Sequence, residues 1–422
     1  MEQKQVTVPP QDPIPSLQKA LSHKLEYVRQ RARIILLTLE GQDENTIAES
    51  VGVSPRTVLK WQNAWAQDGL WIFPQEVFTD TMPVEDEHDA DIDDDEDDEQ
   101  LPLNVNDEQQ EAEFDLMAFK DAPNILPNDS MAEAGRKLML HNLAQMQHYL
   151  PTAIIGEDIE GVHKMRVATR RLRSVLDIFV RYMDTDAYRI VQKRLRQTAR
   201  RLGGVRDLDV FRGYITQYIE TELSGDTEPL LPLFAVFDAQ YGKARRRLEK
   251  WLNGEKYSNF VLTFSAMLQS GDTQLGEDLH LYEVNQMVPR LIYADLEYVR
   301  LHRPFLSQAG PDELHAIRLD LKRLRYALES FAEVLGAEVE TVIKALKRQQ
   351  DHFGELNDMH VAVKLLNDWM KSLAKPDRDA AKAFRHYCQA RAEALTAQVP
   401  SVWEEFDNQQ IRRALAQAVG AL

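Results

Sequence analysis

The chain has 422 residues, of which 44% are hydrophobic and 28% are charged. This length is enough for two or three domains with cores of their own, and no apolar run is long enough to cross a membrane. The N-terminal segment lacks the cationic start and apolar block of a secretion signal, and the single cysteine, Cys388, excludes an intrachain disulfide. We therefore expect a cytoplasmic protein whose one thiol is buried.

The net charge of −18 is concentrated in one segment. Residues 74–122 contain 20 acidic side chains and a single base, Lys120, which leaves the remainder of the chain close to neutral. Local charge rather than net charge governs the encounter with a charged partner. The acidic balance therefore does not exclude an anionic ligand elsewhere in the chain.

Residues 1–73 read as a small helical domain. The spacing of apolar residues predicts helices over 16–40, 44–51 and 55–68, with Gly52 in the turn and Ser54-Pro55 starting the last helix. The helix, glycine turn and helix of this region resemble the helix-turn-helix of transposase-type, homeodomain-like DNA-binding modules. No transposase catalytic domain is expected after it, because the rest of the chain lacks the strands that such a domain needs.

The second helix of this module supplies the side chains that such a domain would present to DNA. Residues 1–73 contain eight bases and eight acids, however, which is a weak electrostatic footprint for a protein that binds a duplex. A three-helix domain that binds another protein is therefore the alternative. The candidate DNA-binding residues are Arg56, Thr57, Lys60 and Asn63.

Residues 74–128 form the predicted linker. Twelve of the fifteen residues from Glu85 to Glu99 are acidic, and such a composition cannot form a packed core. We expect a disordered acidic linker that acts as a solvated spacer. A sharper hypothesis is that it occupies a cationic site of the same chain and so inhibits it.

The remainder, residues 129–422, is predicted to be helical throughout, in two halves of about 129–253 and 283–397. The first half has helices over 131–150, 162–179, 186–202, 208–222 and 230–253; in the second they cover 283–307, 314–331, 338–353, a stretch ending near 371, and 377–397. Gly203-Gly204 and Gly354 are predicted helix stops. The fold class is therefore all-α, with bundle packing.

Two of these helices carry the same motif. His315, Arg318 and Arg325 follow His163, Arg166 and Arg173 at one constant offset of 152 residues, which indicates a duplicated half-domain. At about 100° per residue, the bases of the first copy share one helix face and the apolar residues share the opposite face. A rigid helix that presents guanidinium groups suits phosphate oxygens.

These motifs, together with 202–207 and 354–358, resemble the CHAD domain. The resemblance implies two four-helix bundles related by a pseudo-twofold axis, a basic surface between them and inorganic polyphosphate as ligand, with polyphosphate granules as a potential location. Asn357 departs from the pattern, because the first half has Arg206 there. The residues implied in binding are His163, Arg166, Arg170, Arg171 and Arg173, and His315, Arg318, Lys322, Arg323 and Arg325, extended by Lys193, Arg196, Arg200, Lys344, Lys347 and Arg348.

Three functions fit this sequence. The leading interpretation is a non-catalytic polyphosphate-binding protein, with no catalytic residues, metal ligands or cofactor. A metal-dependent phosphohydrolase would need several carboxylates around the cations, and no such cluster is evident. The third function is a DNA-binding regulator that senses polyphosphate. It differs from the leading interpretation only in whether Arg56 and Lys60 contact DNA. The sequence leaves the oligomeric state open.

Overall fold

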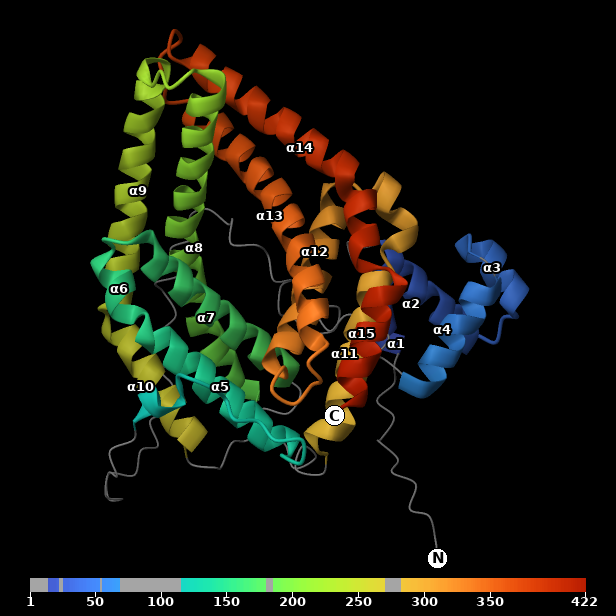
Figure 1. The fold of residues 1–422 in the computed structure, drawn as a ribbon. Coiled ribbons are helices and arrows are strands. Elements are labelled where there is room, and N and C mark those ends of the chain that lie inside the picture. Colours follow the sequence, from blue (N-terminus) through green and yellow to red (C-terminus); the bar gives the residue numbers. More distant parts are fainter. Residues whose placement is uncertain (1–13, 23–25, 54, 69–114, 180–184, 270–281) are drawn as a thin grey trace, which may run out of the picture. The chain divides into compact units, whose positions relative to one another are not determined.

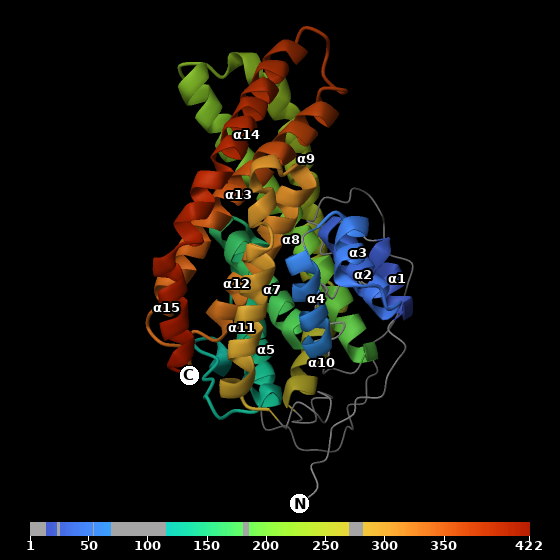
Figure 2. The same cartoon turned by 90° about the vertical axis from the view of Figure 1, so that its right-hand side faces the viewer.

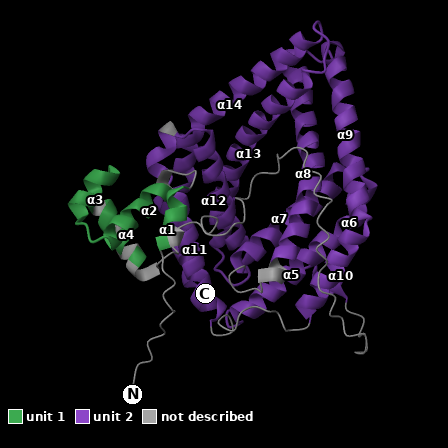
Figure 3. Ribbon diagram, turned by 180° about the vertical axis from the view of Figure 1, so that it is seen from behind, with its two compact units in different colours: residues 1–92 green, residues 93–422 purple. Residues whose placement is uncertain are grey.

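The computed structural model describes residues 14–22, 26–53, 55–68, 115–179, 185–269 and 282–422. The chain divides into two compact units, residues 1–92 and 93–422 (Figure 3). Each unit has its own hydrophobic core. The described residues form helices and no strand, with one isolated bridge between Ser130 and Glu283, so the predicted all-α class is confirmed. Among them, no helix is long and apolar enough to cross a membrane.

The first unit begins with two helices where the sequence predicted one. Helix α1 (Ile14–Leu21) and helix α2 (Glu26–Leu39) pack against each other, so a single helix over 16–40 is wrong. Two short amphipathic helices that fold back bury both of their apolar faces, and a straight helix would leave one of them in water. Leu17 and Ala20 of α1 join Val28 and Ile35 of α2 in the core.

Helices α3 (Glu44–Val51) and α4 (Pro55–Asp68) have the predicted bounds. The Asp43 carboxylate accepts hydrogen bonds from the backbone N–H groups of Asn45 and Thr46, which caps the start of α3. Gly52 ends α3 with a φ of 75°, a left-handed conformation that suits glycine. A helix-turn-helix is therefore present. The acidic residues 85–99 lie outside the described residues.

The second unit contains two bundles (Figure 1). The four principal helices of the first bundle are α5 (Met131–His148), α7 (Ile159–Phe179), α8 (Thr185–Glu222) and α9 (Leu231–Leu252), with α6 (Leu150–Ile155) and α10 (Glu255–Gln269) added. Helix α8 passes through Gly203-Gly204, so the predicted stop there is wrong. The buried side chains of Leu202, Val205, Leu208 and Phe211 continue one apolar stripe across the glycines. Their packing offsets the helix propensity that glycine lacks, about 1 kcal/mol per residue.

The second bundle repeats this plan. Its principal helices are α11 (Val284–Arg300), α12 (Pro311–Ser330), α13 (Val339–Trp369) and α14 (Arg378–Phe406), and α15 (Gln409–Gly420) packs on α13. Helix α13 continues through Gly354, so that stop is also wrong. The predicted helix 283–307 ends earlier, at Arg300, and a 3₁₀ helix, η7 (Arg303–Gln308), follows. Helices α10 and α15 were not predicted.

Aromatic side chains join the two bundles where the hairpins α8–α9 and α13–α14 converge (Figures 1 and 2). The ring of Phe211 lies 5.1 Å from that of Trp369 and 5.8 Å from that of Phe384, and the Tyr218 ring lies 4.9 Å from that of Phe384, between centroids. The edge-to-face contacts of Phe211 add to the stabilisation from burial. These apolar contacts therefore hold the two bundles together, in addition to the contact between α7 and α12.

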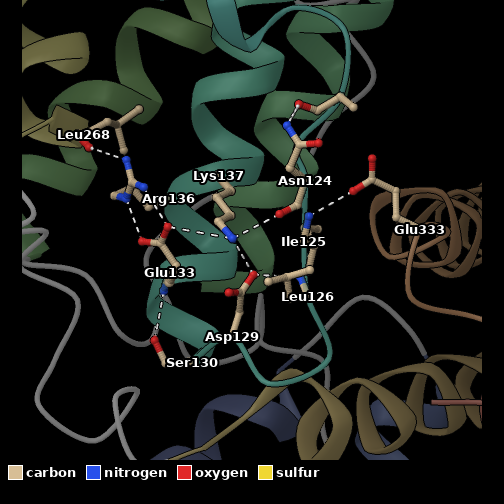
Figure 4. Close-up of polar contacts among 11 residues, drawn as sticks. Asn124, Ile125, Leu126, Asp129, Ser130, Glu133, Arg136, Lys137, Leu268 and Glu333 are labelled. Atoms are coloured by element: carbon tan, nitrogen blue, oxygen red, sulfur yellow. Dashed lines mark hydrogen bonds and ion pairs between the residues drawn. The ribbon is translucent and has the colours of Figure 1, made fainter.

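A segment before α5 forms polar contacts with both bundles (Figure 4). It contains a 3₁₀ helix, η3 (Leu116–Phe119). The Lys137 ammonium of α5 donates to the Asn124 carbonyl at 3.0 Å and pairs with the Asp129 carboxylate at 2.7 Å. The Ile125 N–H donates to the carboxylate of Glu333, just after α12, at 3.0 Å. The segment therefore bonds to both bundles, so the prediction of a disordered linker over 74–128 is wrong for residues 115–128.

Candidate functional site

Helices α7 and α12, which carry the repeated motif, pack against each other where the two bundles meet. The apolar faces of both helices point into the core: Met165 and Leu172 of α7 and Leu321 and Leu324 of α12 have no exposed surface. The predicted amphipathic character is therefore confirmed. It fixes both helices and leaves their charged residues outside the core.

The cations of the first bundle gather around His163, which is partly buried near the start of α7. Burial lowers the pKa of His163, and the nearby charges of Arg206, Arg166 and Arg170 lower it further, with Glu160 acting in the opposite sense. These three guanidinium groups therefore form a cationic region near His163. Arg206 belongs to α8, so the region extends over two helices.

The cations of the second bundle gather around the partly buried carboxylate of Asp358 on α13. Burial raises the pKa of Asp358, whereas Arg318, Arg166 and Lys322 lower it by their charge. Arg166 comes from the first bundle, while Arg318 and Lys322 lie on α12. The two cationic helices predicted from the sequence therefore converge on one carboxylate.

Asp207, the counterpart of Asp358 in the first bundle, lies close to the same place. Its carboxylate is 3.8 Å from the Arg166 guanidinium. The Tyr214 hydroxyl of α8 donates to the Asp358 carboxylate at 3.4 Å. Asp207, Tyr214 and Asp358 line a common cleft of about 10 Å³ between α8 and α13. A cleft of this size holds at most about one water molecule, so a phosphate would have to bind outside it.

Two arginines of α7 cross to the second bundle. Arg170 Nη2 donates to the Tyr326 hydroxyl at 2.5 Å, and Arg171 Nη2 lies 3.1 Å from the Glu329 carboxylate. Glu329 also accepts from Arg325 Nε at 2.6 Å. Tyr326 is buried. These contacts hold α7 and α12 in a fixed register.

Arg323 does not face the other cations. Its Nε donates to Asp295 of α11 at 2.7 Å, its Nη2 lies 3.3 Å from the Asp320 carboxylate, and its guanidinium stacks on the Tyr298 ring. Five residues along a helix turn a side chain by about 140°, which carries Arg323 away from the face of Arg318. Its contacts indicate a structural role, and we leave it out of the proposed binding surface.

The bases of the long helices divide into two groups. Lys193, Arg196 and Arg200 fall on the face of α8 that carries Asp207, and the exposed Lys344 and Lys347 fall on the face of α13 that carries Asp358. Arg348 lies about 80° from that face, and its guanidinium is 3.9 Å from Glu405 of α14. The structure therefore separates Arg348 from the converging cations.

The remaining candidates lie on the two motif helices and in the first unit. Arg173 and His315 are partly buried on the cationic faces of α7 and α12. In the first unit, Thr57 is partly buried on α4. The side chains of Arg56, Lys60 and Asn63 lie outside those that the structure describes. None of these residues changes the location of the candidate site.

A larger groove, about 360 Å³ in volume, lies on the opposite side of α8 from Asp207. Its lining mixes the acids Asp209 and Glu220 with one base, Arg212, so its charge does not suit a polyanion. In the part of the chain that the structure describes, no group of three or more His, Cys, Asp or Glu side chains could hold a metal ion. The converging cations are therefore the candidate site.

Several residues of this site are absent from the candidates that the sequence supplied. Arg206 and Asp207 lie in one of the two turns that accompany the motif, and Asp358 lies in the other, but none of the three was among the residues implied in binding. Nothing in the sequence pointed to Tyr214 or Tyr326, because each contributes only through a hydroxyl group that reaches the other bundle.

Comparison with known families gives two matches. The model of the CHAD domain matches residues 137–367, and that of a homeodomain-like domain matches residues 26–70. Two uncharacterized proteins of Mycobacterium tuberculosis, from strains CDC 1551 / Oshkosh and ATCC 25618 / H37Rv, are each 27% identical over 208 residues. The match covers 47% of this chain and 40% of each relative, so the chain aligns with less than half of their length.

Two solved structures share the fold. The CHAD domain from the plant Ricinus communis superposes with a TM-score of 0.58 at 23% identity, over 68% of this chain and 94% of that one. PptA from Streptomyces chartreusis gives a TM-score of 0.52 at 14% identity, over 65% of this chain and 100% of that one. At these identities, the likeness concerns the fold alone.

Proposed function

Because the chain belongs to the CHAD domain family, which is linked to polyphosphate binding in general, we propose that it binds inorganic polyphosphate without hydrolysing it. The observation that supports this most directly is the convergence of Arg166, Arg318 and Lys322, from both bundles, on Asp358. A polyphosphate chain carries a charge at every unit and little other chemistry. A rigid frame with many cations therefore matches it.

The contacts of the aspartates favour binding over hydrolysis. Asp207 and Asp358 both face guanidinium groups, Asp207 at 3.8 Å from Arg166 and Asp358 near Arg166 and Arg318. A carboxylate with such partners orients them, whereas metal-dependent hydrolysis needs carboxylates that are directed at a divalent ion. Asp207 and Asp358 therefore act as orienting groups in this proposal.

The test is a titration of the purified protein with polyphosphates of several lengths, at several salt concentrations, with orthophosphate release followed in the presence of Mg²⁺. We expect salt-sensitive binding that strengthens with chain length, because a chain held by one bundle meets the second at a high effective concentration. No orthophosphate should appear. Absence of binding at low salt, or steady release of orthophosphate, would contradict the proposal.

DNA binding by the first unit is a second candidate function. The match of residues 26–70 to a homeodomain-like domain favours it, as does the helix-turn-helix of α3 and α4. Substitution of Arg56 and Lys60 by alanine should then abolish binding to duplex DNA and leave polyphosphate binding unchanged. If the unmodified protein does not shift a mixture of duplexes at low salt, a protein partner becomes the better explanation.

A further inference from the structure

Asp358 brings a negative charge into the middle of a cationic surface. A carboxylate at this position repels an anionic ligand, so its presence needs an explanation. It cannot be a simple surface residue, because it is partly buried and accepts a hydrogen bond from Tyr214 at 3.4 Å. Its cationic neighbours come from both bundles.

Each element packed around Asp358 contributes a charged or titratable group. Helix α7 contributes Arg166, helix α8 contributes Tyr214 and, across the small cleft, Asp207, and helix α12 contributes Arg318 and Lys322. Glu355 of α13 and Arg391 of α14, which pair with each other at 2.7 Å, also act on Tyr214 by their charge. Cations from both bundles therefore act on the carboxylate of Asp358 by their charge.

We propose that Asp358 is a positioning residue of the polyphosphate surface, which holds Arg166, Arg318 and Lys322 together in the free protein and takes up a proton when polyphosphate replaces it as their partner. This inference rests on the proposed function. It assigns the residue a role in each state. Without ligand, the negative charge of Asp358 offsets the mutual repulsion of the three cations. With ligand, the bound proton removes the repulsion between the Asp358 carboxylate and the phosphates.

Proton uptake follows from the electrostatics of the site. Burial already raises the pKa of Asp358, and the three cations oppose that effect. When phosphate oxygens pair with these cations, the carboxylate loses part of their stabilisation and gains a negative neighbour, so its pKa rises further. The proton comes from solvent and binds to a carboxylate oxygen of Asp358. By linkage, affinity must then increase as the pH falls.

The test compares Asp358→Asn with Asp368→Asn, a matched control on the same helix. Asp368 is exposed and pairs with Lys371 at 2.7 Å, so both variants remove one negative charge from α13. Calorimetry with long polyphosphate, in two phosphate-free buffers of different ionisation heat between about pH 5 and 7.5, measures the affinity and the number of protons taken up. Because polyphosphate near His163 would also change the protonation of this residue, the comparison is repeated in a His163→Gln background.

We expect Asp358→Asn to bind about fivefold more tightly than the unmodified protein near neutral pH, since the asparagine mimics the protonated carboxyl. In the His163→Gln background it should show no proton uptake, whereas Asp368→Asn should retain the uptake. Should Asp358→Asn fold poorly, Tyr214→Phe provides the test. It removes the hydroxyl that lowers the pKa of Asp358, and so should shift the pH dependence of binding to higher pH.

Two results would overturn the inference and leave the proposed function intact: polyphosphate binding without proton uptake by the unmodified protein, or the same pH profile and affinity for Asp358→Asn and Asp368→Asn. If the unmodified protein does not bind polyphosphate at low salt, both the proposed function and the role of Asp358 fail. Whether the unmodified protein binds polyphosphate at low salt therefore distinguishes failure of the proposed function from failure of the role of Asp358.

Discussion

Arg318 and Arg323 lie five residues apart on α12 and belong to the same repeated motif, yet the structure predicts opposite effects for them. Arg318 faces Asp358 and the cations of the first bundle, whereas Arg323 pairs with Asp295 and Asp320. Replacing each by glutamine removes the same charge from the same helix. Any difference in affinity or stability between the two variants therefore results from where each arginine lies and not from the loss of one charge.

For Arg318→Gln we expect a loss of polyphosphate affinity. A hydrogen bond to a charged group contributes about 1.5–3 kcal/mol, and partial exposure of Arg318 reduces this to about 1–2 kcal/mol, or roughly a 5- to 30-fold rise in Kd. The slope of log K against log salt should fall by about 0.7, the value for one lost phosphate contact on a single-stranded polyanion. Thermal stability should change little.

For Arg323→Gln we expect a loss of stability instead. The Asp295 side chain is only 7% exposed, so it would keep a buried charge without its guanidinium partner. Such a loss costs about 3–5 kcal/mol in a fully buried pair, and the 33% exposure of Arg323 reduces the expectation to about 2–4 kcal/mol. The Kd of the folded protein should stay within about twofold of the original.

The assays are calorimetric titration with long polyphosphate and chemical denaturation, with Arg348→Gln as a control because Arg348 is exposed and lies near Glu405. We expect this control to alter neither quantity appreciably. Arg318 and Arg323 do not have these separate roles if Arg323→Gln, while folded, weakens binding as much as Arg318→Gln. The role of Arg318 is equally refuted if Arg318→Gln binds normally at both low and high salt.

Three further outcomes are expected. Phe211→Ala should lower the free energy of unfolding by about 3–5 kcal/mol in chemical denaturation, because Phe211 is buried against Trp369 and Phe384, while the exposed Leu231→Ala should have little effect. Burial lowers the pKa of His163, His352 and His360, so the unfolded chain binds more protons than the folded protein, and stability should fall as the pH drops through about 6.5. Replacing all three histidines by glutamine should reduce this fall. An unchanged pH profile of stability would contradict the role given to these histidines. Deleting residues 85–99 should tighten polyphosphate binding at low salt if the acidic segment occupies the cationic surface, and an unchanged Kd would support a simple spacer.

The sequence alone was sufficient for the fold class, the duplication and the location of the cationic helices. These features are local, because an apolar stripe and a cationic face both follow from residue spacing within one helix. The constant offset between the copies of the motif then placed two such helices in one domain. Polyphosphate as the ligand entered only through the resemblance to a family, and it stays a proposal.

Tertiary structure decided which of the predicted cations lie together. Arg318 and Arg323 look equivalent in the motif, but their partners, Asp358 and Asp295, lie on other helices and are fixed only by packing. The same holds for the glycines at 203, 204 and 354, which end a helix by local rules and yet lie inside α8 and α13. Packing against neighbouring helices outweighs a local preference of about 1 kcal/mol, and no pattern within one helix reveals which neighbours it will have.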